Sequence, residues 1–376
     1  MSSSPPAPAV EVGGLRKSFT FKGQAIEAVR GIDLTVAAGE VFGLLGPNGA
    51  GKTTTLRILT TLLPADAGTA LVAGADVRRS PGQVRRRIGY VGQLGGADAT
   101  ATGRENLMLA GRLYGLSAAA TRARCAELLG VFGLESLAAR AVRTYSGGQR
   151  RRLEVALGIM HRPRVLFLDE PTTGLDPQNR ANLWSQLRLL RDGGTTVFLT
   201  THYLDEADQL CDRVAIVDHG RVIALGRPDR LKERYSGDTI TVTPDVPDAA
   251  LGDVARLLAG AACVSGAVAG EDGTVRVTVA RAGRAPGGTA GAAGSLADGA
   301  GAGNGDATAA MAAVFAVLAE RGIGTRGAAL ARPSLDDVFL RETGRSLRDT
   351  GDPGGSGSGA ESGSALGEHA DAGVTA

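Results

Sequence analysis

Short apolar runs recur along the first two thirds of the chain and alternate with stretches that have the 3.6-residue period of amphipathic helices. The runs occupy residues 41–45, 88–91, 165–168, 197–200 and 214–217. Continuous apolar runs between helices are typical of strands that a parallel sheet buries on both faces. The pattern therefore predicts an α/β domain that extends to about Tyr235.

Two parts of this domain depart from the pattern. Residues 32–36 alternate between apolar and polar side chains, which predicts a half-exposed strand of an antiparallel sheet. Residues 104–140 have helical periodicity and contain no strand candidate. They predict a helical subdomain at about residues 100–160.

The order of elements changes after Gly237. The pattern predicts a strand, a helix, a weaker strand, a strand and a helix, at about residues 240–242, 251–258, 263–268, 275–279 and 311–318. This order favours a small α+β domain of the ferredoxin-like β-α-β-β-α-β type. We place this domain at residues 237–343, after the α/β domain at residues 9–236.

The end of the small domain carries a short apolar stripe. Ser334 and Asp337 form a capping box that begins a helix, and Leu335, Val338 and Phe339 lie on one face of that helix. Because so short a helix is not stable alone, the stripe must be buried against another element. The simplest interpretation is that it packs on the small domain itself.

Glycine-rich segments lie outside the predicted core elements. Residues 281–308 and 349–376 hold nine and eight of the 56 glycines and almost no large apolar side chain. Such segments cannot bury enough surface to offset the entropy of ordering. We therefore predict a disordered N-terminus at residues 1–8, a disordered insert at residues 281–308 and a disordered acidic tail at residues 344–376.

Composition and charge exclude several classes of protein. With 43% hydrophobic and 21% charged residues, the chain resembles ordinary globular proteins, which excludes wholesale disorder and a many-span membrane protein. A net charge of +2 without a basic tract argues against a nucleic-acid partner. We expect neither a membrane span nor a signal peptide. Cys125, Cys211 and Cys263 are too widely spaced to indicate a disulfide framework or a zinc site.

A phosphate-binding loop follows the first predicted parallel strand. The pattern G-x-x-x-x-G-K-[ST] is matched by Gly46, Pro47, Asn48, Gly49, Ala50, Gly51, Lys52 and Thr53, with Thr54 beginning the helical stretch at residues 54–62. The glycines allow backbone N–H groups to surround a phosphate, while Lys52 neutralises the β- and γ-phosphate oxygens and Thr53 ligates Mg²⁺. A strand, this loop and a helix predict a nucleoside-triphosphate site.

Two adjacent carboxylates, Asp169 and Glu170, end the predicted strand at residues 165–168. Packing does not require carboxylates at the end of an apolar strand, so the pair indicates a chemical role. Asp169 can hold Mg²⁺ through its water shell, and Glu170 can accept a proton from, or orient, the water that attacks the γ-phosphate. The alternative is a solvated charge pair at the end of a strand.

Several further motifs follow the phosphate loop in a recognisable order. Ser146, Gly147, Gly148 and Gln149 precede an amphipathic helix and offer a second N-terminus that suits an anion. The order along the chain is the phosphate loop, Gln93, the segment 146–149, Asp169 and Glu170, Asp176, and His202. Over about residues 8–235 the sequence therefore resembles the ATP-binding cassette (ABC) ATPases.

The resemblance implies a RecA-like P-loop fold, with ATP and Mg²⁺ as ligands. It implies that Phe19 stacks on adenine, that Gln93 senses Mg²⁺ and the attacking water, and that His202 contacts the γ-phosphate. It also places Asp176 among the nucleotide-binding residues and assigns the segment 146–149 to the ATP site of a second copy. From the residues alone, Phe19 could instead be a core residue, Gln93 a surface residue and His202 a solvated loop residue.

Details of these motifs resemble one branch, the daunorubicin/doxorubicin-resistance ATP-binding proteins. The resemblance covers almost the whole chain, including the segment 333–340, whereas the glycine-rich insert and the acidic tail depart from it. It implies an ATPase that drives drug efflux, in which two copies enclose two ATP molecules head to tail under a separately encoded permease. That arrangement implies a location at the cytoplasmic face of the membrane. It also suggests that the helix at Ser334 stabilises the pairing of the copies or the contact with the permease.

Another possible class is a soluble cassette ATPase of translation or DNA repair. Translation-type members usually carry two cassettes and repair-type members a long coiled coil, and the sequence shows neither. The sequence does not indicate which substrate is transported, because the residues that contact the substrate would lie in the permease.

Overall fold

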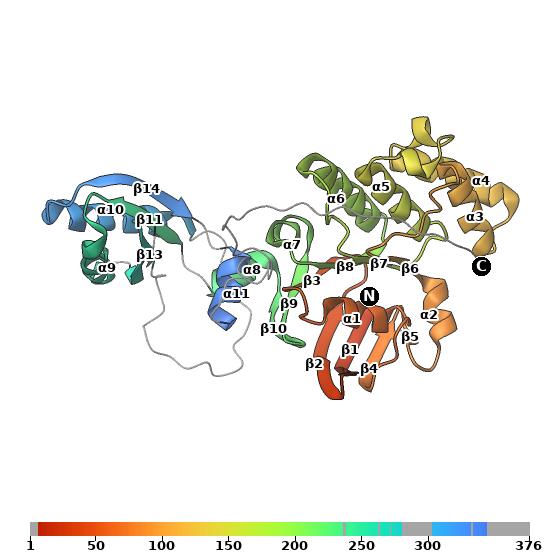
Figure 1. Cartoon of the computed structure of the whole chain (residues 1–376), viewed down its shortest axis with the longest axis horizontal. Coiled ribbons are helices and arrows are strands. Elements are labelled where there is room, and N and C mark those ends of the chain that lie inside the picture. Colours follow the sequence, from red (N-terminus) through yellow and green to blue (C-terminus); the bar gives the residue numbers. More distant parts are fainter. Residues whose placement is uncertain are drawn as a thin grey trace, which may run out of the picture.

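The computed structural model describes residues 7–235, 238–261, 264–270, 272–279, 303–331 and 334–343. These residues form three sheets with helices packed on them (Figure 1). Cys263, the predicted acidic tail and most of the predicted disordered N-terminus lie outside the described residues. Among the described helices, none is long and apolar enough to cross a membrane.

The central sheet has the strand order β10-β9-β3-β8-β7-β6. Its strands are β3 (Val41–Leu45), β6 (Ile88–Val91), β7 (Val165–Asp169), β8 (Thr196–Thr201), β9 (Arg213–Asp218) and β10 (Arg221–Gly226). The neighbours from β9 to β6 pair in parallel, as the apolar runs predict, and every residue of β3 and β7 is buried. β10 returns antiparallel to β9 through a tight turn at His219 and Gly220, which both have positive φ.

The two faces of the central sheet are covered differently (Figure 1). One side holds α1 (Lys52–Leu59) and the antiparallel sheet of β2 (Gln24–Val36), β1 (Val10–Phe21), β4 (Ala67–Val72) and β5 (Ala75–Asp76), with α2 (Pro81–Arg87) beside it. Leu34, Leu56 and Phe42 belong to the core between these layers. The half-exposed strand predicted at residues 32–36 is confirmed as the C-terminal end of the longer strand β2, where Ile32, Leu34 and Val36 are buried and the polar residues between them are exposed.

The other side holds the helical subdomain and further helices. The subdomain contains α3 (Gly103–Leu113), α4 (Ala118–Val131), the 3₁₀ turns η1 (Glu135–Leu137) and η2 (Val142–Thr144), and α5 (Gly147–Gly158). Its helices begin at hydroxyl N-caps, namely Thr102, Ser117 and Ser146. α6 (Pro177–Asp192), α7 (Leu204–Leu210) and α8 (Pro228–Tyr235) complete the domain.

The C-terminal domain has the predicted β-α-β-β-α-β order. It consists of β11 (Thr239–Pro244), η3 (Asp248–Ala250), α9 (Leu251–Ala259), β12 (Val264–Ala269), β13 (Val275–Val279), α10 (Gly303–Glu320) and β14 (Thr325–Ala331). The strands form an antiparallel sheet in the order β12-β13-β11-β14, with a core of its own that includes Ile240, Leu258 and Val314. Both the element order and the sheet order are those of a ferredoxin-like domain.

The predicted disordered insert at residues 281–308 is wrong at its C-terminal end. Helix α10 begins at Gly303, so residues 303–308 are helical. The alanines that begin at Ala307 explain the difference, because alanine has the highest helix propensity and helix formation is cooperative. The rest of the segment, residues 281–302, lies outside the described residues.

The last helix, α11 (Leu335–Thr343), packs on the α/β domain and not on the small domain. Leu335, Val338 and Phe339 are fully buried in the same core as Leu210 of α7 and Leu231 of α8. The buried apolar side chains of the small domain's sheet pack against α9 and α10, and no residue of α11 belongs to that core. The expected packing on the small domain is therefore wrong, although the capping box is present.

We expect Phe339→Ala to destabilise the α/β domain by about 3–5 kcal/mol, because it removes a fully buried ring and leaves a cavity between α7, α8 and α11. Equilibrium denaturation in urea measures the loss. Leu340→Ala is the matched control, because the neighbouring Leu340 is exposed. An unchanged unfolding midpoint for Phe339→Ala would contradict the packing of α11.

Candidate active site

The phosphate loop lies between β3 and α1, where the parallel strands end. At Gly46 a Cβ atom would come within 2.2 Å of the Val217 carbonyl oxygen, and at Gly51 it would come within 2.3 Å of the Ala28 carbonyl oxygen. Gly51 also has a φ of 97°, which other residues rarely adopt. The loop therefore requires glycine at both positions because it packs directly against neighbouring backbone.

Lys52 folds back over this loop. Its Nζ donates hydrogen bonds to the carbonyl oxygens of Gly46 (2.8 Å) and Pro47 (3.0 Å) and lies 3.5 Å from Oε1 of Glu170. The residue is only 4% exposed. Burial lowers the pKa of Lys52, and the nearby carboxylates of Glu170 and Asp169 oppose that effect.

Asp169 lies beside the start of α1. Its Oδ1 accepts hydrogen bonds from the hydroxyl groups of Thr53 (3.0 Å) and Thr200 (2.7 Å). The carboxylate is buried at the end of β7. Thr53 and Asp169 thus place a hydroxyl oxygen and a carboxylate oxygen next to each other and next to the phosphate loop.

Glu170 is the centre of the site. Its carboxylate is only 8% exposed. One oxygen, Oε2, accepts a hydrogen bond from Gln93 Nε2 (2.9 Å). The other oxygen, Oε1, lies 3.3 Å from Nδ1 of His202 and is also close to Lys52. Its backbone has a φ of 46°, a left-handed conformation that costs about 1–3 kcal/mol in a residue with a side chain. The Glu170 N–H donates to both Oγ1 (3.0 Å) and the carbonyl oxygen (3.2 Å) of Thr200, which helps to hold this conformation.

The surroundings of Glu170 keep its carboxyl group ionised. The contact with His202, the charge of Lys52 and the hydrogen bond from Gln93 lower the pKa of Glu170 to about 2, although burial acts in the opposite direction. A buried carboxylate of this kind can accept a hydrogen bond from a water molecule and orient it. Negative phosphates near Lys52 would weaken the effect of Lys52 on Glu170, and the basicity of the carboxylate would then rise.

The structure brings six of the predicted site residues together: Lys52, Thr53, Gln93, Asp169, Glu170 and His202. The other predicted residues have different surroundings. Phe19 is 40% exposed on β1, and Ser146 forms a capping box with Gln149 at the exposed start of α5. Asp176 caps α6, where its Oδ1 accepts the backbone N–H of Asn179 (2.9 Å).

Three features of this region were not predicted. Thr200 contacts both acidic residues, and Arg151 of α5 donates to the backbone that carries them. His161, interpreted from the sequence as a surface residue, is half-buried instead. Its ring stacks on Tyr114 with centroids 3.7 Å apart, its Nε2 lies 2.8 Å from the Ile88 carbonyl oxygen, and burial lowers its pKa.

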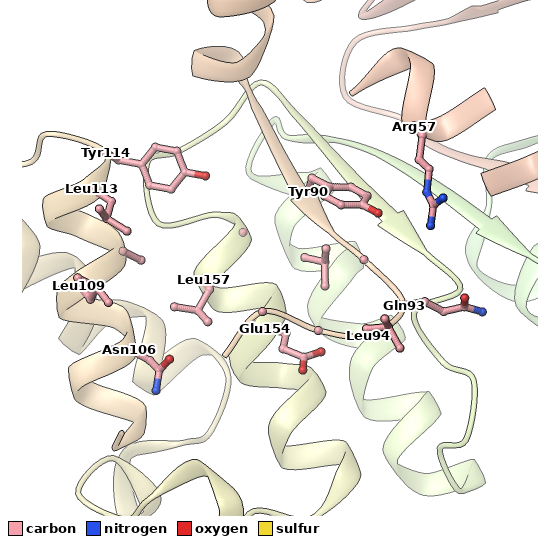
Figure 2. Close-up of a pocket in the computed structure, with 16 residues that line it drawn as sticks. Arg57, Tyr90, Gln93, Leu94, Asn106, Leu109, Leu113, Tyr114, Glu154 and Leu157 are labelled. Carbon is pink, nitrogen blue, oxygen red and sulfur yellow. The ribbon is translucent and has the colours of Figure 1, made fainter. Parts of the chain in front are cut away.

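A groove of about 720 Å³ opens next to Gln93, between the end of β6 and helices α3 and α5 (Figure 2). The exposed apolar side chains that line it are Leu94, Leu109, Leu113 and Tyr114. Gln93 lies at the edge of this groove and also contacts Glu170. The groove and the Glu170 carboxylate are therefore linked through one side chain.

Comparisons with known proteins agree with this geometry. The family model described as "ABC transporter" matches residues 29–173. Daunorubicin/doxorubicin resistance ATP-binding protein DrrA of Streptomyces peucetius is 53% identical over 235 residues, which cover 62% of this chain and 70% of that protein. Daunorubicin resistance ATP-binding protein DrrA3 of Streptomyces coeruleorubidus is 46% identical over 340 residues, covering 90% of this chain and 97% of that protein.

Among solved structures, a dimeric ATP-binding cassette in a post-hydrolysis state, bound to ADP and Pi, is 25% identical with a TM-score of 0.54. The match covers 58% of this chain and 98% of that chain. The fold and the site define a P-loop ATPase that binds and hydrolyses ATP. The chain belongs to the ATP-binding proteins of the ABC transporter family.

The predicted fold class, ATPase activity and family are thus confirmed. The protein is the nucleotide-binding subunit of an ABC transporter, and the alternative of a soluble ATPase of translation or DNA repair is not favoured.

Proposed function

We propose that this protein hydrolyses ATP to drive the export of an antibiotic-type drug through a separate membrane permease. The observation that carries the catalytic part is the contact of one buried carboxylate, Glu170, with Lys52, Gln93 and His202. Relatives named for daunorubicin and doxorubicin resistance support drug efflux as the purpose of that hydrolysis.

Hydrolysis follows from the roles of these side chains. The backbone N–H groups of residues 46–54 and Lys52 bind the phosphates, and the N-terminus of α1 adds a favourable dipole. Glu170 accepts a proton from the attacking water or orients it, while Gln93 and His202 hold the carboxylate and the γ-phosphate region in place. Because little covalent chemistry is required of the protein, positioning and charge supply most of the rate enhancement.

The oxygen atoms around Asp169 fit Mg²⁺. Magnesium in ATPases is commonly bound by one or two protein oxygens, water and substrate phosphates, and Thr53 and Asp169 provide such oxygens with Gln93 nearby. The described residues contain no cluster of three His, Cys, Asp or Glu side chains that would hold a metal alone. When bound, the ion would neutralise phosphate charge.

A second copy of the chain would complete the nucleotide site. Phe19 is exposed and available to stack on adenine, and the start of α5 at Ser146–Gln149 presents backbone N–H groups at the surface. Asp176 lies close to that helix start, since its partner Asn179 packs against Gly148. The dimeric state of the similar cassette structure supports a head-to-tail pair that encloses two ATP molecules.

The groove beside Gln93 is the proposed docking site of the permease. Its exposed leucines and Tyr114 offer an apolar surface to a short helix or loop, and Gln93 connects that surface to Glu170. Docking there would place the protein at the cytoplasmic face of the membrane. Closure of the ATP-bound dimer would then move the docked permease segment.

Co-expression with a membrane permease, sought first in the gene next to this one, tests this proposal. We expect Leu113→Glu to leave the ATPase activity of the purified protein unchanged but to weaken co-purification with the permease and abolish resistance to an anthracycline. The reason is that Leu113, 78% exposed in the groove, would carry a charge into an apolar interface.

Leu189→Glu is the matched control, because Leu189 is a 61% exposed leucine on α6 outside the groove. It should retain both co-purification and resistance. Full resistance in cells that carry Leu113→Glu would contradict docking in the groove. If the wild-type pair gives no resistance, the assignment to drug efflux is wrong.

A further inference from the structure

Arg151 is a buried residue of α5 whose guanidinium group has an acceptor for each of its five N–H donors. Nε donates to the carbonyl oxygen of Pro171 (2.9 Å), Nη1 to the Gly92 carbonyl (2.8 Å) and Glu154 Oε2 (3.0 Å), and Nη2 to the carbonyls of Asp169 (3.1 Å) and Glu170 (3.4 Å). A lysine has three donors on a flexible stem and cannot reproduce this planar set of contacts. Lysine therefore cannot replace Arg151 in these contacts.

Three of these acceptors are the consecutive carbonyl groups of residues 169–171, which carry both acidic side chains of the active site. Glu170 is the residue with the left-handed backbone, and its N–H is already held by Thr200. Arg151 holds the carbonyl side of the same residue. Both peptide groups of Glu170 are thus held in its strained conformation. Thr200 of the neighbouring strand β8 accepts from its N–H, and Arg151 of α5 donates to its carbonyl oxygen.

The other two acceptors connect Arg151 to the loop that carries Gln93. The Gly92 carbonyl belongs to this loop, and the Glu154 carboxylate packs on it so closely that a Cβ at Gly95 would lie 2.0 Å from Oε1. Figure 2 shows Glu154 beside the loop of Gln93 and Leu94 at the groove. One guanidinium group therefore joins the Gln93 loop to the Glu170 loop.

We propose that Arg151 is a positioning residue that holds Glu170 in its strained conformation and sets its distance from Gln93. The side-chain contact between Gln93 and Glu170 depends on two loops that are 77 residues apart in sequence, and Arg151 contacts both. Arg151 contacts the backbone carbonyl groups of both loops and does not contact the carboxylates of Asp169 and Glu170 themselves in these hydrogen bonds. The inference rests on the proposed catalytic role of Glu170.

Purified full-length Arg151→Lys and Arg151→Met proteins test the inference. We expect turnover to fall about 10- to 100-fold, because a small displacement of a catalytic group has an effect of that size. Binding of a fluorescent ATP analogue should stay close to the wild-type value, because the phosphate loop is not among the contacts of Arg151. A loss confined to turnover distinguishes positioning from general destabilisation.

Arg152→Met is the matched control on the same helix. Arg152 donates to the Phe132 carbonyl (2.9 Å) in the helical subdomain, so its loss should lower the melting temperature without lowering turnover. Chemical rescue adds a second readout. Millimolar guanidinium should restore part of the turnover of Arg151→Ala and none of any turnover lost in Arg152→Ala.

Folded Arg151→Lys protein with wild-type turnover would overturn the inference, and so would a parallel loss of ATP binding and turnover. If the Arg151 variants do not fold, Glu154→Gln decides the question: reduced turnover with normal ATP binding supports the inference, and wild-type turnover overturns it. Glu170→Gln in the same assay separates the two hypotheses. If the Glu170→Gln variant keeps wild-type turnover, the proposed catalytic role of Glu170 is wrong, whatever the Arg151 variants show.

Discussion

Glu170→Gln protein is expected to bind ATP as the wild type does and to hydrolyse it about 10²- to 10⁴-fold more slowly, the usual contribution of a positioned general base. The substitution keeps the shape of the side chain but removes its charge and its ability to accept a proton. Phosphate release from the purified protein measures turnover, and titration with labelled ATP measures binding.

The surroundings of Glu170 explain why the effect should be specific to hydrolysis. The carboxylate contacts Gln93, His202 and Lys52, whereas the phosphate loop that binds ATP is shaped by its own backbone and by Lys52. Because the pKa of Glu170 is about 2, well below the ordinary 4.5, the wild-type carboxylate is ionised throughout the neutral range. The Glu170→Gln variant would thus differ from the wild type in charge at every pH at which turnover is measured.

The same variant should accumulate as a closed dimer when ATP is added, since the nucleotide that joins the two copies is no longer hydrolysed. Size-exclusion chromatography with and without ATP detects this change. Glu127→Gln is the control, because Glu127 is an exposed glutamate that pairs with Arg124 and Arg162 on the helical subdomain. Wild-type turnover in Glu170→Gln would show that another group activates the water.

Much of the α/β domain could be predicted because its signals are local. Continuous apolar runs identify the parallel strands, since a strand buried on both faces has no polar positions, and β3 and β7 show this pattern. The phosphate loop and the Asp169–Glu170 pair are each contiguous, and the order of the motifs then indicates the family. Even the hairpin at His219 follows from a short turn sequence.

The contacts that complete the site could not be predicted, because they join segments far apart in sequence. Arg151 stands between Arg150 and Arg152, and arginine is rarely buried, so the sequence does not single it out. Only the fold shows that the middle arginine is buried. The stripe around Phe339 indicates that α11 must be buried, but an apolar stripe does not specify its partner. The burial of His161 could not be predicted for the same reason, because its contacts with Tyr114 and the Ile88 carbonyl oxygen join segments far apart in sequence.

Helix α1 illustrates an intermediate case. Its existence follows from the motif, but it begins at Lys52 and ends at Leu59, whereas the sequence predicts residues 54–62. The glycine at its N-cap, Gly51, has no side chain to mark the start, and the following threonines do not distinguish a loop from a helix. The earlier start matters, because it places the backbone of Lys52 in the first helical turn, where N–H groups are free to bind phosphate.

Lys52→Ala should weaken both ATP binding and hydrolysis. Lys52 is the only cation among residues 46–54, and loss of one preorganised electrostatic contact costs on the order of 3 kcal/mol in the transition state, or about 10²-fold in rate. The removal also leaves the Gly46 and Pro47 carbonyl oxygens without their donor and Glu170 without a neighbouring positive charge. Titration with labelled ATP and steady-state phosphate release measure the two effects separately.

Lys232→Ala is the matched control for Lys52→Ala. Lys232 pairs with Asp208 (2.6 Å) between α8 and α7 at the surface, where an ion pair contributes little to stability. It should therefore keep normal affinity and turnover. Because Lys52 is buried, circular dichroism must first show that Lys52→Ala is folded; we expect that it is, because alanine places no charge of its own in the buried site. A folded Lys52→Ala protein with unchanged affinity and turnover would mean that the backbone of the loop alone binds the phosphates.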